Sequence, residues 1–119
     1  MKKKVVYYID ARGQNPVWTF ITHLPAQERE KCFEYIAYLE TFGEDVRRPV
    51  GDYLGSKLYE LRLKGSRILY FFMLRDYAVL VHAFKKKGNA IADSDMTLAQ
   101  RRKADFVSRY EKGWLKLGE

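Results

Sequence analysis

Two charged residues occupy alternate positions of a short apolar run, and their spacing indicates where they point. Residues 58–63 read Leu-Tyr-Glu-Leu-Arg-Leu. In a strand, side chains alternate between the two faces, so Glu60 and Arg62 share one face and the apolar residues share the other. A Glu and an Arg two positions apart can form a surface pair, which contributes little to stability. They can also both contact a ligand on the open face of a sheet.

Further cations are expected near this pair. Arg67 follows the next turn, and Lys85, Lys86 and Lys87 end a later apolar run. Arginine binds phosphate oxygens through a planar fork, and lysine binds them as a point charge. The pattern therefore predicts a concave, basic groove on the sheet. The alternative for the lysine run is a solvated strand end.

His82 is the residue whose intrinsic pKa best suits proton transfer near neutral pH. It lies within an apolar run, at residues 78–84. In such a setting, a packed strand histidine that is hydrogen-bonded to a neighbour is the more frequent case. His23 precedes Leu24 and Pro25 at an expected helix entry, and we assign it a structural role.

The first half of the chain is expected to supply one strand and two helices. Residues 5–9 are β-branched and aromatic and form a strand. Pro16 begins a short helix, and Pro25 opens a second one that ends near Phe42, with Gly43 as its stop. In that second helix, Phe33, Ile36, Ala37 and Leu39 are expected to face the core, and Glu28, Arg29, Lys31 and Glu40 to face water. Residues 44–56 are charged and contain glycine and proline, so we interpret them as a loop.

The second half is expected to supply a β-meander and a closing helix. Apolar runs at 58–63, 68–74 and 78–84 are separated by hairpin-length turns. Ser94 or Asp95 can cap the last helix, which Gly113 would end. On that helix Arg101, Arg102 and Lys103 form the solvated side or contact a polyanionic partner. The order predicts a single α+β domain over residues 1–119, with an antiparallel sheet of about four strands and the helices packed on one face of it.

Composition narrows the class of protein. The net charge is +7, and the excess lies entirely in residues 57–119, which favours a polyanionic partner but also suits a merely soluble surface. Cys32 is the one cysteine, so no intrachain disulfide forms, and the His and Cys spacing does not fit a zinc site. The residue 5–9 run is too short for a secretory segment, and no later run reaches the roughly 18 apolar residues of a membrane span. We expect a cytoplasmic protein.

Three segments together resemble one family. They are residues 58–62 (Leu-Tyr-Glu-Leu-Arg), 65–70 (Gly-Ser-Arg-Ile-Leu-Tyr) and 82–87 (His-Ala-Phe-Lys-Lys-Lys). The combination resembles the HigB-like, phage-derived branch of the RelE/ParE toxins of type II toxin–antitoxin systems. The likeness extends weakly over the whole chain, since the two helices before the meander and the closing helix follow the family order.

The resemblance implies a function and a set of site residues. RelE-like toxins cleave messenger RNA in the ribosomal A site without a metal, by attack of a ribose 2′-hydroxyl on the adjacent phosphate. Arg62 and Lys86 fall where such toxins place basic groove residues, and Arg67 falls on their phosphate-clamping arginine. With His82 these form the expected catalytic set, and Lys57, Glu60, Lys85 and Lys87 are expected to contact RNA. No cofactor or metal is expected.

The resemblance leaves the general base open and two other functions in view. No tyrosine in residues 88–96 matches the family's base, Glu60 stands where some relatives have lysine, and residues 88–92 replace a Thr-Gln-Lys-Thr-Pro segment. The alternatives are a ParE-like inhibitor that binds DNA gyrase and a non-catalytic RNA-binding relative. A toxin of either kind implies a cognate antitoxin, often a helix-turn-helix protein, and a nuclease implies the ribosome and messenger RNA as partners.

Overall fold

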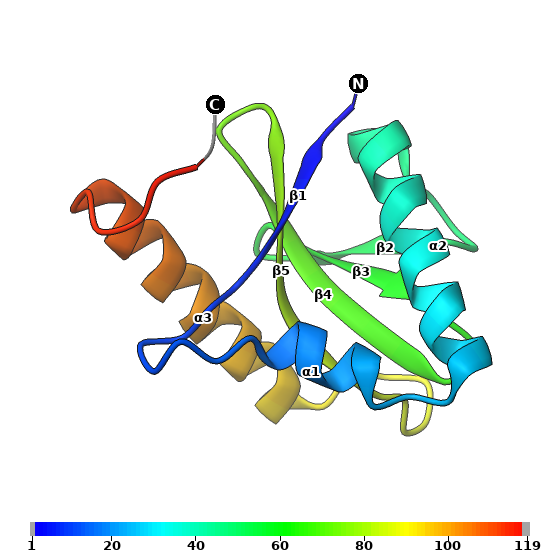
Figure 1. Ribbon diagram of the computed structural model, residues 1–119. Helices are drawn as coiled ribbons and strands as arrows, with labels where there is room; N and C mark the ends of the chain where they lie inside the picture. Colours follow the sequence, from blue (N-terminus) through cyan, green and yellow to red (C-terminus); the bar gives the residue numbers. More distant parts are fainter. Residues whose placement is uncertain (1, 118–119) are drawn as a thin grey trace.

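The structure, a computed structural model, describes residues 2–117. Figure 1 shows a strongly twisted sheet with helices on both sides. The strands are β1 (Lys4–Tyr7), β2 (Gly51–Gly55), β3 (Leu58–Arg62), β4 (Ser66–Met73) and β5 (Tyr77–Lys85); the helices are α1 (Pro16–Thr22), α2 (Ala26–Phe42) and α3 (Asp93–Glu111), with a short 3-10 helix, η1, at Gly43–Asp45. The α+β class expected from the sequence is confirmed.

The sheet has five strands in the order β1-β5-β4-β3-β2 and is mixed. β2 to β5 form antiparallel pairs, whereas β1 runs parallel to β5, with Val5 opposite Ala78. The expectation of about four antiparallel strands is therefore corrected. β2 lies inside the segment interpreted as a loop, because its residues gain backbone partners from β3 that a local pattern does not reveal.

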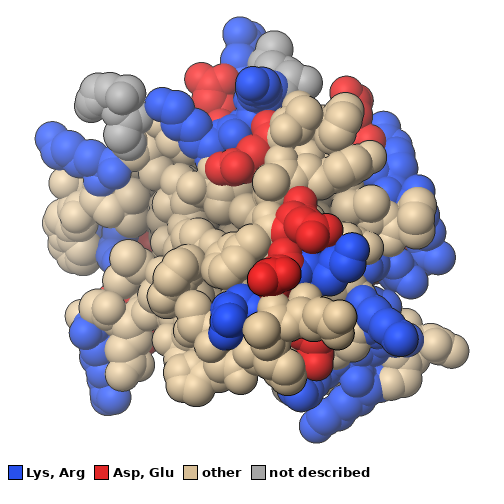
Figure 2. Space-filling view, turned by 45° about the vertical axis from the view of Figure 1, so that its right-hand side comes forward, with Lys and Arg blue, Asp and Glu red and all other residues tan. Residues whose placement is uncertain are grey.

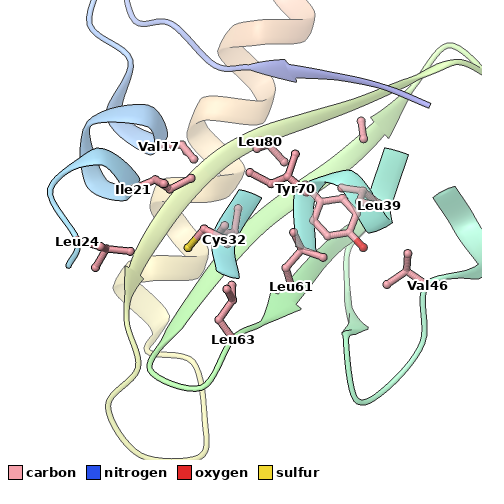
Figure 3. Close-up of a cluster of buried hydrophobic side chains, with 13 residues drawn as sticks. Val17, Ile21, Leu24, Cys32, Leu39, Val46, Leu61, Leu63, Tyr70 and Leu80 are labelled. Atoms are coloured by element: carbon pink, nitrogen blue, oxygen red, sulfur yellow. The ribbon is translucent and has the colours of Figure 1, made fainter. Parts of the chain in front are cut away.

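The helices cover both faces of the sheet. One core cluster places α1 and α2 against Leu61, Ile68, Tyr70 and Leu80, as Figure 3 shows for most of these side chains. A second cluster packs Ala99 and Phe106 of α3 against the opposite face. The expectation that all helices pack on one face was wrong. β4 and β5 are apolar at successive positions, and successive side chains point to opposite faces. Both faces of these strands are therefore apolar, and helices pack on each of them.

Local signals explain most helix ends. The side chain of Asn15 accepts a hydrogen bond from the Trp18 amide and caps α1, and Gly43, with φ +52°, ends α2. Two details differ from expectation. Ala37 is exposed on α2. Neither Ser94 nor Asp95 caps α3, because the helix begins at Asp93 and the Asp95 carboxylate is engaged by another side chain.

A bulge in the β4–β5 pairing changes the direction of β5 side chains. Leu69 pairs with His82 and Tyr70 with Leu80, so Val81 is the extra residue. Val79 and Val81 pack toward α3, and Leu80, which lies between them in the chain, packs toward α1 and α2. Strict alternation would turn His82 toward α1 and α2. The bulge turns it toward α3 instead.

Within residues 2–117, no helix combines the length and the apolar character that crossing a membrane requires.

Candidate functional site

Glu60, Arg62 and Arg67 form one cluster, which we call the Glu60 cluster. β3 and β4 place Arg62 directly opposite Arg67, and Glu60 lies two residues before Arg62 on the same face. A carboxylate oxygen of Glu60 is 2.6 Å from Nη1 of Arg62, and the other is 3.4 Å from Nε of Arg67. The alternation predicted for residues 58–63 thus brings two guanidinium groups to one carboxylate.

Burial separates the roles that the two arginines can have. The Arg67 side chain is only 8% exposed. Its Nη1 donates to the carbonyls of Leu63 at 2.6 Å and Ser66 at 3.0 Å, and burial lowers the pKa of Arg67. Arg67 therefore ties the β3–β4 turn to β3. The Arg62 side chain is 26% exposed, so part of its guanidinium remains open to a ligand.

The lysines lie at two ends of this region. Lys85, Lys86 and Lys87 are exposed, and the Lys86 amide donates to the Gly65 carbonyl at 2.9 Å, which places the lysine run beside the β3–β4 turn. Lys57 lies in the β2–β3 turn, at the opposite end of β3 from Arg62. There it faces Lys103 of α3, whose pKa is lowered by burial and by the charge of Lys57.

His82 belongs to a different group of side chains. Its Nε2 is 2.7 Å from the Asp95 carboxylate, and its Nδ1 is 3.5 Å from Nη1 of Arg102, both residues of α3. The imidazole is 11% exposed. Burial lowers the pKa of His82, and the opposing attraction of Asp95 does not cancel this effect. Glu60 and His82 both pair with Leu69 of β4, so they lie on the same face of the sheet with Leu69 between them, and the contacts of Arg67 run toward β3.

Two hollows are described in the surface formed by residues 2–117, and the catalytic cations expected from the sequence line neither. One, of about 340 Å³, lies between α2 and the β3–β4 turn and is lined by Cys32, Glu28 and Lys64, among others. The other, of about 740 Å³, lies at the edge of β5 and is lined by residues of the β1–α1 segment together with His82 and Arg102. The expected groove around Arg62, Arg67 and Lys86 is thus an open surface around Arg62, with Arg67 beneath it.

Charge on one face of the molecule is uneven. Figure 2 shows Lys and Arg side chains around much of the outline of this face, most densely along its right-hand side, with Asp and Glu near the centre and at the top. Among residues 2–117, no three His, Cys, Asp or Glu side chains are grouped so that they could hold a metal ion.

Sequence reasoning missed Asp95 and treated Arg102 as a solvated or RNA-contacting residue. Arg102 is partly buried and donates to the Val81 carbonyl at 2.9 Å. Neither contact has a local signal, because Asp95 and Arg102 lie 13 and 20 residues beyond His82. The sequence predicted the last helix, α3, but it did not predict which face of the sheet this helix covers.

Comparison with known proteins gives one family. The profile described as "Phage derived protein Gp49-like (DUF891)" matches residues 19–104. This segment includes α2, the whole meander and the first half of α3. No curated protein matches the chain.

Proposed function

Because this chain belongs to the family of phage-derived Gp49-like proteins, which is associated with RelE-like toxins, we propose that it is the toxin of a type II toxin–antitoxin pair. The proposed activity is that of a metal-independent endoribonuclease, which cleaves messenger RNA at the ribosome and so inhibits translation. The α+β arrangement is compatible with the RelE-like fold.

The observation that carries this proposal is the Glu60 cluster. Attack of a 2′-hydroxyl on a phosphodiester builds negative charge on the phosphorane oxygens, and preorganised cations stabilise that charge. Arg62 and Arg67 come from neighbouring strands and are held by one carboxylate, so their positions are defined before substrate arrives. Arg62 is the member that a phosphate can reach.

In the absence of substrate, Glu60 is the ion-pair partner of both arginines in this cluster. Its carboxylate already neutralises part of the charge of both arginines. An RNA phosphate that approaches Arg62 competes with Glu60 for the guanidinium. Lys85, Lys86 and Lys87, beside the β3–β4 turn, supply further positive charge along the RNA backbone. Lys57 adds a contact at the far end of β3.

The partners follow from this activity. The ribosome presents the messenger RNA, and the site of action is the cytoplasm. A cognate antitoxin, such as a helix-turn-helix protein, would cover or neutralise the surface around Arg62 and the lysine run. No metal and no organic cofactor takes part in the proposed reaction.

Arg62→Gln tests the function. In a translating extract, the purified protein should cut messenger RNA, and Arg62→Gln should lower the cleavage rate roughly 100-fold, since a preorganised donor to the transition state is lost. Lys31→Gln is the matched control, because it also removes one positive charge, from an exposed pair with Glu34 on α2. Arg67→Ala is less informative because it also removes the bonds that hold the β3–β4 turn.

Three results would contradict the nuclease. Intact transcripts during continued translation would exclude it. Inhibition of DNA supercoiling by gyrase, with transcripts intact, would support the ParE-like alternative. Tight RNA binding without cleavage, and normal growth of cells that express the protein alone, would identify a non-catalytic relative.

A further inference from the structure

A histidine, a carboxylate and a guanidinium meet at the edge of β5, on the same face of the sheet as the Glu60 cluster and one strand further on. The bulge turns His82 toward α3, where Nε2 is 2.7 Å from Asp95 and Nδ1 is 3.5 Å from Arg102. Arg102 is itself held by the Val81 carbonyl at 2.9 Å and lies over the Tyr8 ring, 5.7 Å from its centroid. Arg102 is therefore held by a backbone and a ring contact, and Asp95 is held by its contact with His82.

These contacts define which imidazole nitrogen carries the proton. A guanidinium only donates hydrogen bonds, so the nitrogen facing Arg102 is the acceptor. Nδ1 of His82 is then unprotonated, and Nε2–H donates to the Asp95 carboxylate. A carboxylate that holds one ring N–H stabilises the imidazolium that forms, and Nδ1 becomes free to accept a proton once a phosphate competes for the Arg102 guanidinium.

The hollow at the edge of β5, which we call the β5-edge hollow, gives this nitrogen a place for substrate. β1 pairs with β5 only as far as Leu80, so the edge of β5 beyond that residue is open. His82 and Arg102 line the hollow, together with Asn15, Phe20 and other residues of the β1–α1 region, whereas Asp95 does not. Its volume of about 740 Å³ is within the range of small-ligand sites.

We propose that His82, Asp95 and Arg102 form a proton-transfer site for RNA at the β5-edge hollow, with His82 as the base, Arg102 as the phosphate ligand and Asp95 as the positioning residue. This inference rests on the proposed nuclease function. It assigns the general base that the sequence left open to β5, one strand away from the Glu60 cluster on the same face of the sheet. The Glu60 cluster then holds a neighbouring stretch of the RNA backbone.

The proposed reaction moves one proton to His82 and exchanges one phosphorus–oxygen bond for another. Nδ1 of His82 removes the proton of a ribose 2′-hydroxyl, and the oxygen forms a bond to the adjacent phosphorus while Arg102 stabilises the phosphorane charge. The bond from phosphorus to the 5′-oxygen breaks, and a water molecule supplies the proton of the leaving oxygen. The imidazolium returns its proton to solvent. The products are a 2′,3′-cyclic phosphate and a 5′-hydroxyl.

Four ionisable groups face this site and set its pH response. Asp95 and Arg102 come from α3, Tyr8 follows β1, and Asp10 lines the hollow from the β1–α1 segment. Asp95 raises the pKa of His82 and Arg102 lowers it, while burial, the largest effect, brings it below 6.5. The neutral base is therefore present at neutral pH, and the rate should fall only on the acidic side of pH 6.5.

The ring protons can be observed without any activity. The chain has two histidines, so nitrogen-15 NMR of the imidazole rings gives two patterns, and His23→Gln assigns them. At pH 7.5 we expect His82 to be neutral with its proton on Nε2. A proton on Nδ1, or a charged ring at this pH, would overturn the proposal even if RNA is cleaved.

Cleavage on ribosomes programmed with a short messenger RNA tests the chemistry. His82→Gln should lower kcat roughly 100-fold or more, as expected when a general base is lost, whereas His23→Gln, at the exposed end of α1, should not. The acidic limb of the pH profile should move to lower pH in Asp95→Asn and to higher pH in Arg102→Gln. Asp93→Asn is the control for Asp95, since Asp93 is exposed in the same helical turn.

The outcomes separate this proposal from the function on which it rests. If the unchanged protein cleaves no messenger RNA, the nuclease function fails, whatever the NMR shows. If it cleaves and Arg62→Gln is impaired, but His82→Gln retains full activity, the nuclease function stands and the His82 site is refuted. If the acidic limb of the pH profile moves in the same direction in Asp95→Asn as in Arg102→Gln, the two residues have only a structural role.

Discussion

Glu60 is the most constrained charged residue of the candidate site. Its side chain is 4% exposed, and it meets Arg62 and Arg67 at 2.6 and 3.4 Å. A buried carboxylate is tolerated only when cations or hydrogen bonds compensate its lost hydration. The same argument applies in reverse to Arg67, whose buried guanidinium depends on Glu60 and on two carbonyls. The pair that the sequence allowed as a surface pair is thus part of a buried network.

Glu60→Gln should therefore destabilise the protein. The change leaves the Arg67 charge buried without its carboxylate, and breaking a buried pair in this way costs roughly 3 kcal/mol of unfolding free energy. Urea unfolding followed by circular dichroism measures the loss. Glu34→Gln is the matched control, because Glu34 pairs with Lys31 at 3.2 Å in an exposed position on α2 and should change the stability little. Equal effects of the two changes would contradict this account.

At the scale of elements, β2 and the bulge in β5 decide where the site residues point. β2 places Gly51 against the Glu60 backbone: a Cβ at Gly51 would lie 2.8 Å from the Glu60 carbonyl oxygen and 2.8 Å from a methyl group of Val46. A side chain there would push β2 away from β3. The bulge in turn shifts the phase of β5 and directs His82 to α3. Both features are pairing properties of strands, not of single residues.

Gly51→Ala should lower stability by about 2 kcal/mol, since overpacking of a close contact costs roughly that much. The substitution also strains the backbone that carries Glu60, so cleavage should weaken together with stability. Thermal unfolding measures the first effect. Gly65→Ala is the control, because a Cβ at Gly65 has no neighbour within 4 Å. If Gly51→Ala is as stable as this control, β2 can move away from Glu60 without a loss of stability, and the predicted close contact is not limiting.

At the scale of the whole molecule, charge is distributed along the chain in a way that suits RNA. Residues 1–56 carry equal numbers of acidic and basic side chains, and the excess of +7 lies in residues 57–119. That second half forms β3, β4, β5 and α3, which also hold the Glu60 cluster and the His82 site. Positive charge that neutralises RNA phosphates releases counterions, so the affinity depends on salt.

RNA affinity should therefore fall with salt, and the lysine run should account for a defined part of the slope. Replacing Lys85, Lys86 and Lys87 by Gln should reduce the slope of log K against log salt by about 2, at roughly 0.7 per contact to single-stranded RNA. Fluorescence anisotropy with a labelled RNA measures it. The control replaces Lys2, Lys31 and Lys116, which are exposed elsewhere. Identical slopes in both triple variants would mean that RNA binds away from β5.

Elements with local signals could be predicted from the sequence. Turn residues and capping groups predicted α1, α2 and the meander, because these depend on near neighbours in the chain. Alternation in residues 58–63 correctly placed Glu60 and Arg62 on one face, since the side chain direction in a regular strand depends only on parity. The charged half of the chain was equally visible.

The way in which these elements pack together depends on long-range contacts. The pairing of β1 with β5, the recruitment of β2 and the face that α3 covers each depend on contacts between residues far apart in the chain. The same holds for the burial of Arg67. Parity failed at His82 because one extra residue in β5 reverses every later side chain. Asp95 could meet His82 only after that reversal and after α3 had packed across the sheet, which is why no pattern in the sequence predicted the contact.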